Sequence, residues 1–103
     1  MDNHSAEHFS QHLNTKFRVN VDSPAPVELE LVEVTLRPNE PNEQADMERF
    51  SIFFHGPGNF FLPQQTYEVA HPNMGEFAIF LVAIGQDQAG FRYEAVFNRF
   101  KDE

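Results

Sequence analysis

Apolar and polar residues alternate in six segments of the chain, a pattern typical of β-strands that bury one face. Short turns separate most of these segments, which favours antiparallel strands joined in sequence order. We expect a mainly β fold, a small barrel of about six strands, with a two-sheet sandwich as the alternative. The predicted strands are Phe17–Val21, Val27–Leu36, Arg49–His55, Gln65–Ala70, Glu76–Ile84 and Phe91–Phe97.

The second predicted strand changes phase half-way along its length. Val27, Leu29 and Leu31 share one face, whereas Val32 and Val34 continue the apolar pattern one residue out of step. A pattern of period two shifts in this way only where an extra residue forms a β-bulge or a bend. We therefore expect the sheet to bend or close between Leu31 and Val32.

The predicted strand Glu76–Ile84 is apolar on both faces. Phe77, Ile79, Leu81 and Ala83 alternate with Ala78, Phe80, Val82 and Ile84. Such a strand is either central, with its second face covered, or part of a binding surface.

A short N-terminal helix is predicted from Ser5 to about Asn14. Ser5 can cap it, and Phe9 and Leu13 lie one turn apart. A helix of two to three turns is marginal alone. We therefore expect it to cover an open end of the barrel or the outer face of the strand Glu76–Ile84.

The remaining segments are predicted turns, loops and ends of one domain, residues 1–103. Residues 37–48 are polar and contain two prolines, which predicts a long, mobile loop. Residues 55–64 (H-G-P-G-N-F-F-L-P-Q) contain two glycines and two prolines and are expected to form a turn region. Residues 1–4 and 101–103 are expected to fray.

Charge excludes two classes of partner. Sixteen acidic residues against seven Lys and Arg give a formal net charge of −9. Binding to a nucleic acid backbone or an anionic membrane depends on Lys and Arg, so neither partner is expected. Twelve Phe and two Tyr can supply most of a small core, because each buried aromatic side chain removes roughly 150–250 Å² from water.

Cysteine is absent, which rules out disulfides, thiolate metal sites and a cysteine nucleophile. The N-terminal residues lack the basic and apolar regions of a signal peptide, and the longest apolar run, Phe77–Ile84, is too short to span a bilayer. A cytoplasmic location is the default expectation.

The weak candidates for metal ligands are His4, His8 and His12, which would form a stripe on a helix because they are four residues apart. The alternative is a chance stripe near the chain end, and no fourth ligand is evident. His55 and His71 each border a turn, and we expect both to cap it by hydrogen bonding. No motif of a serine nucleophile is present, so we predict no catalytic residue and no cofactor.

Exposed aromatic residues point instead to a protein partner or to self-association. Phe60 and Phe61 lie within the turn region, where they either fold back over a barrel end or stay exposed. The predicted partner-binding surface comprises Phe53, Phe60, Phe61, Phe80 and Val82.

Several segments, in this order, resemble a small bacterial family known as domain of unknown function 6916. They are F-S-I-F-F-H-G-P (50–57), L-P-Q-Q-T-Y (62–67), H-P-N-M-G-E-F (71–77), F-L-V-A-I-G (80–85) and Y-E-A-V-F-N (93–98). The chain departs from the family at Gln65, where Gly is common, and at His55, where Arg is commoner. The resemblance implies a compact β domain and a link to phage-tail-like proteins.

Three hypotheses of function follow. The first is a non-enzymatic binding or assembly module, an accessory of a phage-tail-like system. The second is a carrier that holds a small ligand inside the barrel, although twelve Phe would more naturally fill that space. The third is a metal-dependent enzyme that uses the histidine stripe.

Overall fold

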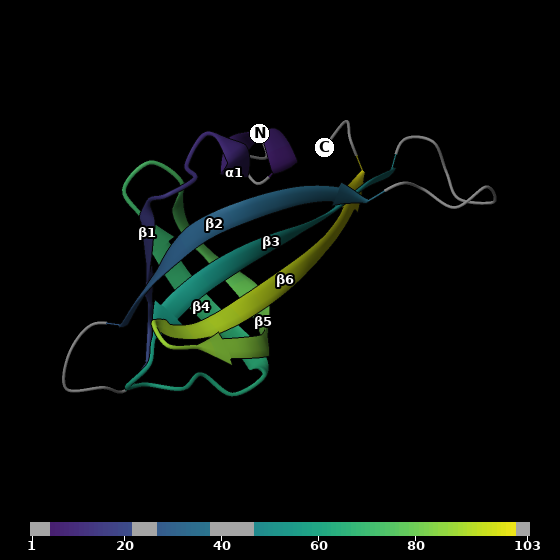
Figure 1. Ribbon diagram of the computed structural model, residues 1–103. Coiled ribbons are helices and arrows are strands. Elements are labelled where there is room, and N and C mark those ends of the chain that lie inside the picture. Colours follow the sequence, from purple (N-terminus) through teal and green to yellow (C-terminus); the bar gives the residue numbers. More distant parts are fainter. Residues whose placement is uncertain (1–4, 22–26, 38–46, 101–103) are drawn as a thin grey trace.

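The computed structural model describes residues 5–21, 27–37 and 47–100. In these ranges a short helix precedes six strands (Figure 1), and no helix there is long and apolar enough to cross a membrane. The elements are α1 (Ala6–Ser10), β1 (Lys16–Val19), β2 (Val27–Arg37), β3 (Met47–Pro57), β4 (Gln65–His71), β5 (Gly75–Asp87) and β6 (Gly90–Phe100).

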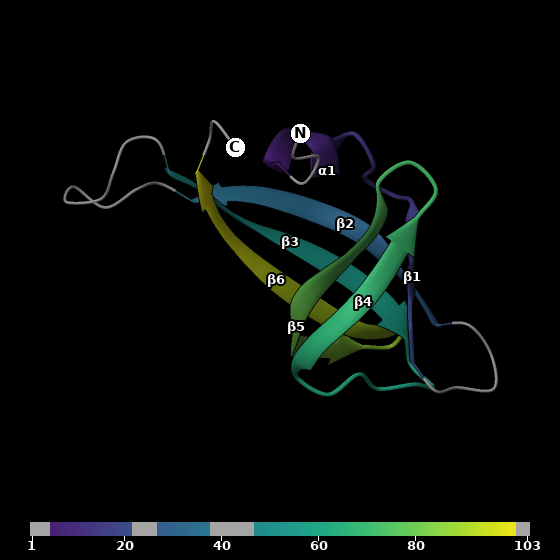
Figure 2. The ribbon, with the colours of Figure 1, turned by 180° about the vertical axis from the view of Figure 1, so that it is seen from behind.

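The strands close into a barrel in the order β1-β2-β3-β6-β5-β4, and β1 pairs with β4 to complete the ring. Every pairing between neighbouring strands is antiparallel. The barrel prediction is therefore confirmed, together with the mainly β fold class and the short N-terminal helix. The view from behind shows the β4–β5 pair as the wall opposite β2 and β3 (Figure 2).

The predicted bend in the second strand is confirmed as a β-bulge. Leu31 pairs with Phe54, and Glu33 pairs with the preceding residue, Phe53, so Val32 is the additional residue in β2. A bulge bends its strand and increases the local twist, which helps a six-stranded sheet to close.

Alternation along the strands places one set of side chains inside the barrel. Leu29, Phe54 and Tyr93 have no exposed surface. The fully buried side chains are Phe9, Phe17, Leu29, Leu31, Phe50, Ile52, Phe54, Leu62, Val69, Leu81 and Tyr93. The interior is consequently filled with packed apolar groups.

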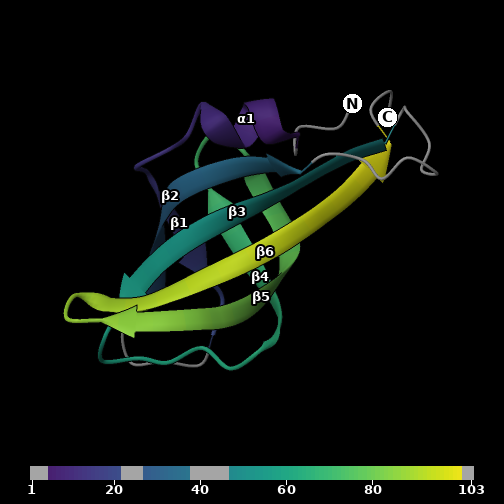
Figure 3. The same ribbon diagram turned by 45° about the vertical axis from the view of Figure 1, so that its right-hand side comes forward.

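One half of the barrel splits open where β5 changes its partner. Residues of β5 up to Leu81 pair with β4, whereas those from Val82 onward pair with β6. A second bulge lies between Ala83 and Gly85. Beyond Glu94, β6 pairs with β3 alone among the described strands. β2, β3 and β6 therefore continue together as a three-stranded arm, and β5 turns away from β6 (Figure 3).

The helix α1 closes this split half. Phe9 is completely buried, and the rings of Phe17, Phe50, Phe77 and Phe97 lie 6.4, 6.1, 5.8 and 5.3 Å from it between centroids. These rings come from both sides of the opening. Of the two positions expected for the helix, the barrel end is the one observed. Phe80 and Ile84, on the outer face of β5, are exposed.

The ends of two elements differ from the sequence prediction. The helix is capped by Ser5, whose side chain accepts a hydrogen bond from the backbone N–H of His8, as expected. It ends at Ser10 instead of Asn14, and residues 11–14 form a turn in which Asn14 has a left-handed φ of 68°. The first strand likewise ends at Val19 and not at Val21.

The third strand includes residues that the sequence assigned to a turn. Gly56 pairs with Phe91 and is buried, because Leu29 and Tyr93 pack directly against its backbone. The predicted loop 37–48 is also shorter than expected, since Arg37, Met47 and Glu48 belong to strands. The rest of that loop and the predicted frayed ends lie outside the described residues.

Candidate functional site

An apolar area on the outside of the barrel is the main candidate site. We call it the β5–β6 face and define it as Phe80, Val82 and Ile84 of β5 with Val96 of β6. Exposed fractions are 49% for Phe80, 44% for Ile84 and 47% for Val96. Because Val82 pairs with Glu94, Phe80 and Val96 are each two residues from that pair, on the same outer face. They flank the point where the two strands separate.

Acidic residues lie along the β4 and β5 side of this face, and Arg92 pairs with Gly85, next to Ile84. Pairing and alternation put Glu68 of β4 and Glu76 of β5 on the same outer surface, and Glu94 lies beside Val82. The sequence contains no Lys or Arg between Arg49 and Arg92. The strands β4 and β5 therefore contribute carboxylates and no cations to the rim.

Arg92 is held by its neighbours. Its Nη2 donates to Glu33 Oε1 at 2.8 Å, and its guanidinium carbon lies 4.9 Å from the centre of the Phe53 ring. Hydrogen bonds from Thr35 and then from Arg92 hold the pKa of Glu33 below its usual value. Phe53, a predicted partner residue, is thus on the outer face but is covered by Arg92.

Two other predicted partner residues, Phe60 and Phe61, lie at the opposite end of the barrel from α1. The backbone N–H of Leu62 donates to the Tyr93 hydroxyl at 3.0 Å, which draws this loop over the barrel end. Phe60 packs partly against the core, and Phe61 is half exposed with its ring 5.2 Å from that of Phe91. The five predicted residues therefore occupy two places and not one surface.

Val96 was missed at the level of sequence. It occupies an outward position of β6 between Glu94 and Asn98, so it breaks the polar side of the alternation. An apolar residue at a polar position was the available signal. What the sequence did not show is that Val96 lies two residues beyond the point where β5 parts from β6.

His8 and His12, two of the three histidines of the predicted stripe, have different neighbours. His8 Nδ1 lies 2.9 Å from Ser5 Oγ, whereas the His12 ring packs 4.7 Å from that of His71. His4 lies outside the described residues. Within the described ranges, no group of three or more His, Asp or Glu side chains could hold a metal ion.

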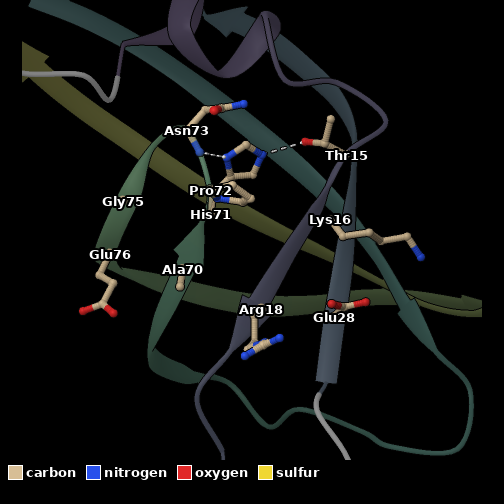
Figure 4. Close-up of a pocket in the computed structure, with 10 residues that line it drawn as sticks. All are labelled: Thr15, Lys16, Arg18, Glu28, Ala70, His71, Pro72, Asn73, Gly75 and Glu76. Atoms are coloured by element: carbon tan, nitrogen blue, oxygen red, sulfur yellow. Dashed lines mark hydrogen bonds between the residues drawn. The ribbon is translucent and has the colours of Figure 1, made fainter.

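His71 caps its turn, as predicted, and is 6% exposed. Its Nδ1 accepts from the backbone N–H of Asn73 at 3.0 Å (Figure 4). The Thr15 hydroxyl donates to the His12 carbonyl at 2.6 Å, so its oxygen accepts from His71 Nε2 at 3.0 Å. Burial, and next the nearby His12, lower the pKa of His71. The two hydrogen bonds fit the neutral form of the ring and give it a structural role.

The prediction for His55 is wrong. It lies within β3, and its Nε2 is 3.3 Å from Asp87 Oδ1. Asp87 is the residue that caps the β5–β6 turn, accepting from the backbone N–H groups of Ala89 and Gly90 at 2.9 Å. The contact with His55, followed by these backbone hydrogen bonds, lowers the pKa of Asp87.

A surface pocket of about 660 Å³ lies beside His71 (Figure 4). Lys16, Arg18, Glu28 and Glu76 line it, with cations and carboxylates mixed. Their side chains point in different directions, and both nitrogens of His71 already have partners. The pocket therefore offers no convergent set of groups for a ligand.

Comparison with known proteins identifies a family. The family described as Domain of unknown function (DUF6916) matches residues 4–97. No curated protein and no solved structure matches the chain.

Proposed function

We propose that this chain, which belongs to the DUF6916 family, is a non-enzymatic protein-binding module that acts through its β5–β6 face. The observation that carries the proposal is the set of three half-exposed apolar side chains, Phe80, Ile84 and Val96, on neighbouring strands of one outer face. The outer face of an antiparallel sheet that meets water is ordinarily polar.

Burial of this face would contribute binding free energy. Complete burial of a large apolar side chain stabilises by roughly 1.5–3 kcal/mol, so covering the exposed half of each would contribute roughly 1 kcal/mol. The β5–β6 face is small, and its apolar residues would form the centre of an interface with a polar rim.

The charge of the rim selects the partner. With Glu68, Glu76 and Glu94 around the face and a net charge of −9, the chain favours a partner that presents apolar groups with Lys or Arg beside them. A second copy would bring like charges together, which disfavours self-association. The family resemblance makes an accessory role in a phage-tail-like assembly one setting for such a module.

The packed interior favours this proposal over a ligand carrier. Phe17, Phe50, Phe54 and Tyr93 fill the barrel and have no exposed surface. A carrier would have to displace these rings to hold a ligand inside. The third hypothesis, a metal-dependent enzyme, gains no support from His8 and His12, which have different neighbours.

Site-specific photo-crosslinking tests the proposal. A photoreactive residue replaces Val96 in one version of the chain of residues 1–103. In the other version it replaces Asn59, which is exposed on the loop at the barrel end. We expect a discrete crosslinked protein from position 96 in cells of the source organism and none from position 59. The substitution Phe80→Lys should remove that product while leaving the fold intact.

Two outcomes would overturn the proposal. One is an equal crosslinking pattern from positions 96 and 59, because the face would then have no preference over an ordinary surface. The other is a partner whose crosslinking at position 96 persists unchanged in the Phe80→Lys variant.

A further inference from the structure

The β5–β6 face adjoins a strand edge that no described strand occupies. From Ala95 to Phe100, β6 pairs along one side with β3, whereas its pairing with β5 ends at Val82 and Glu94. Figure 3 shows β6 as the outermost strand of the arm from this point. Backbone groups along such an edge can pair with another extended chain.

Residues 95–100 (A-V-F-N-R-F) lack two of the usual protections of a strand edge, a proline and a β-bulge, and Arg99 is the one charged residue among them. Val96 is half exposed on the outer side of this edge. On the inner side, the centroid of the Phe97 ring lies 4.9 Å from that of Phe50, on which it stacks, and 5.3 Å from that of Phe9. The inner side of the strand therefore packs against the aromatic core.

We propose that the partner adds an extended segment to this edge of β6, so that the interaction is β-strand addition along residues 95–100. This inference rests on the proposed function and specifies its binding mode. Backbone hydrogen bonds would supply affinity, and side chains at alternate positions would supply specificity. Those on the outer side would meet Phe80 and Val96.

The charges near this edge indicate which residues the partner's strand would contain. By their registers, the outer side chains near the split are Glu76, Phe80, Glu94, Val96 and Asn98. Asn98 accepts a hydrogen bond from Arg49 Nε at 2.9 Å, so this cation already has a partner. A segment that alternates apolar residues with Lys or Arg matches both the apolar centre and the carboxylates. We therefore assign the edge to a basic, apolar strand of a different protein.

Hydrogen exchange, measured by NMR on the ¹⁵N-labelled chain of residues 1–103, tests the binding mode. The probe is a nine-residue peptide of alternating Val and Lys, with a Val and Glu peptide as its control. At ten times its Kd, the basic peptide should slow exchange about tenfold at every second amide of residues 95–100. The substitution Val96→Lys should weaken this protection, and Asn59→Lys should not.

The possible results separate this inference from the proposed function. Chemical-shift changes at Phe80 and Val96 without slowed exchange would overturn strand addition and leave the protein-binding face standing. No response to the basic peptide, or an equal response to the acidic one, would overturn the assigned partner strand, and the crosslinking experiment would still decide the proposed function. A concentration-dependent dimer that Val96→Lys abolishes would assign the edge to a second copy and overturn the inference.

Discussion

The barrel has two halves that are closed in different ways. In the half near the β5–β6 turn, the ring is completed by backbone pairing, with Gly56 opposite Phe91 and Pro57 opposite Gly90. In the other half, β5 leaves β6, and the opening is filled by α1 through Phe9. One half depends on close approach between backbones, the other on packed aromatic rings.

This difference explains where a free edge can persist. Complete pairing removes strand edges, so the closed half offers no site for another strand. In the split half, β5 and β6 no longer pair, and α1 fills the gap between them from the inside of the sheet through Phe9. The outside of β6 is left with half-exposed Val96 next to a backbone edge, away from β3, that no other described strand pairs with. Both the candidate face and the candidate edge therefore arise from the same divergence.

The largest effect is expected from removing the aromatic closure of the split half. Phe9→Ala deletes a fully buried ring that contacts rings from β1, β3, β5 and β6. We expect the free energy of unfolding to fall by about 3–5 kcal/mol, measured by urea denaturation. Leu13→Ala, at a residue 36% exposed, serves as the control. A loss below about 1 kcal/mol for Phe9→Ala would show that α1 is not needed to close this half.

A smaller effect is expected from crowding the closed half. A Cβ at Gly56 would lie 2.6 Å from Leu29 Cδ2 and 3.1 Å from Tyr93 Cε2, and neither side chain has room to move because both are fully buried. We expect Gly56→Ala to lower the free energy of unfolding by about 1–3 kcal/mol. Gly85→Ala is the matched control, since a Cβ there has no neighbour within 4 Å. Equal stabilities for the two variants would contradict the close packing.

Protonation of His71 in acid should lower the free energy of unfolding. The pKa of this ring is lowered in the folded state by burial and by His12, so the unfolded chain binds the proton more readily. Stability contributed by neutral His71 is therefore complete above the ordinary pKa of 6.5 and is lost as pH falls through the folded value. Protonation would also place an N–H at Nδ1, facing the N–H of Asn73.

Denaturation of the wild type and of His71→Gln between pH 7.5 and 5 measures this effect. We expect the free energy of unfolding of the wild type to decrease across this range, and that of the variant to change less. Parallel pH profiles for the two proteins would exclude His71 as the cause.

The smallest effect on stability is expected at the β5–β6 face. Val96 is half exposed, so Val96→Thr should change the free energy of unfolding by no more than about 0.5 kcal/mol. The same substitution should reduce fluorescence of a neutral apolar dye, because it removes a methyl group from the apolar surface. Unchanged dye fluorescence would indicate that the face is not a continuous apolar surface.

Much of the fold could be predicted from local patterns. The alternation of period two identified all six strands, and the change of phase at Val32 located the bulge in β2. The cap at Ser5 and the turn at His71 were also predicted, because the groups involved are within three residues of each other. Such features depend on neighbours in sequence, which the chain itself specifies.

The remaining features depend on contacts between distant residues. Gly56 has the sequence of a turn, but Leu29 and Tyr93 pack against it and keep it in β3. The predicted partner residues Phe53 and Phe61 lie at separate sites. Arg92 covers Phe53, and Phe61 contacts Phe91, whose side chain points to the opposite face of β6 from that of Arg92.

The residue pattern specifies a mainly β domain with many aromatic residues, a net negative charge and a strand, Glu76–Ile84, that is apolar on both faces. The position of α1 at the barrel end and the separation of β5 from β6 at Val82 follow from contacts between distant residues. Periodicity reports which side of a strand is apolar. Which strand lies beside it, and where their pairing stops, depends on packing across the whole ring.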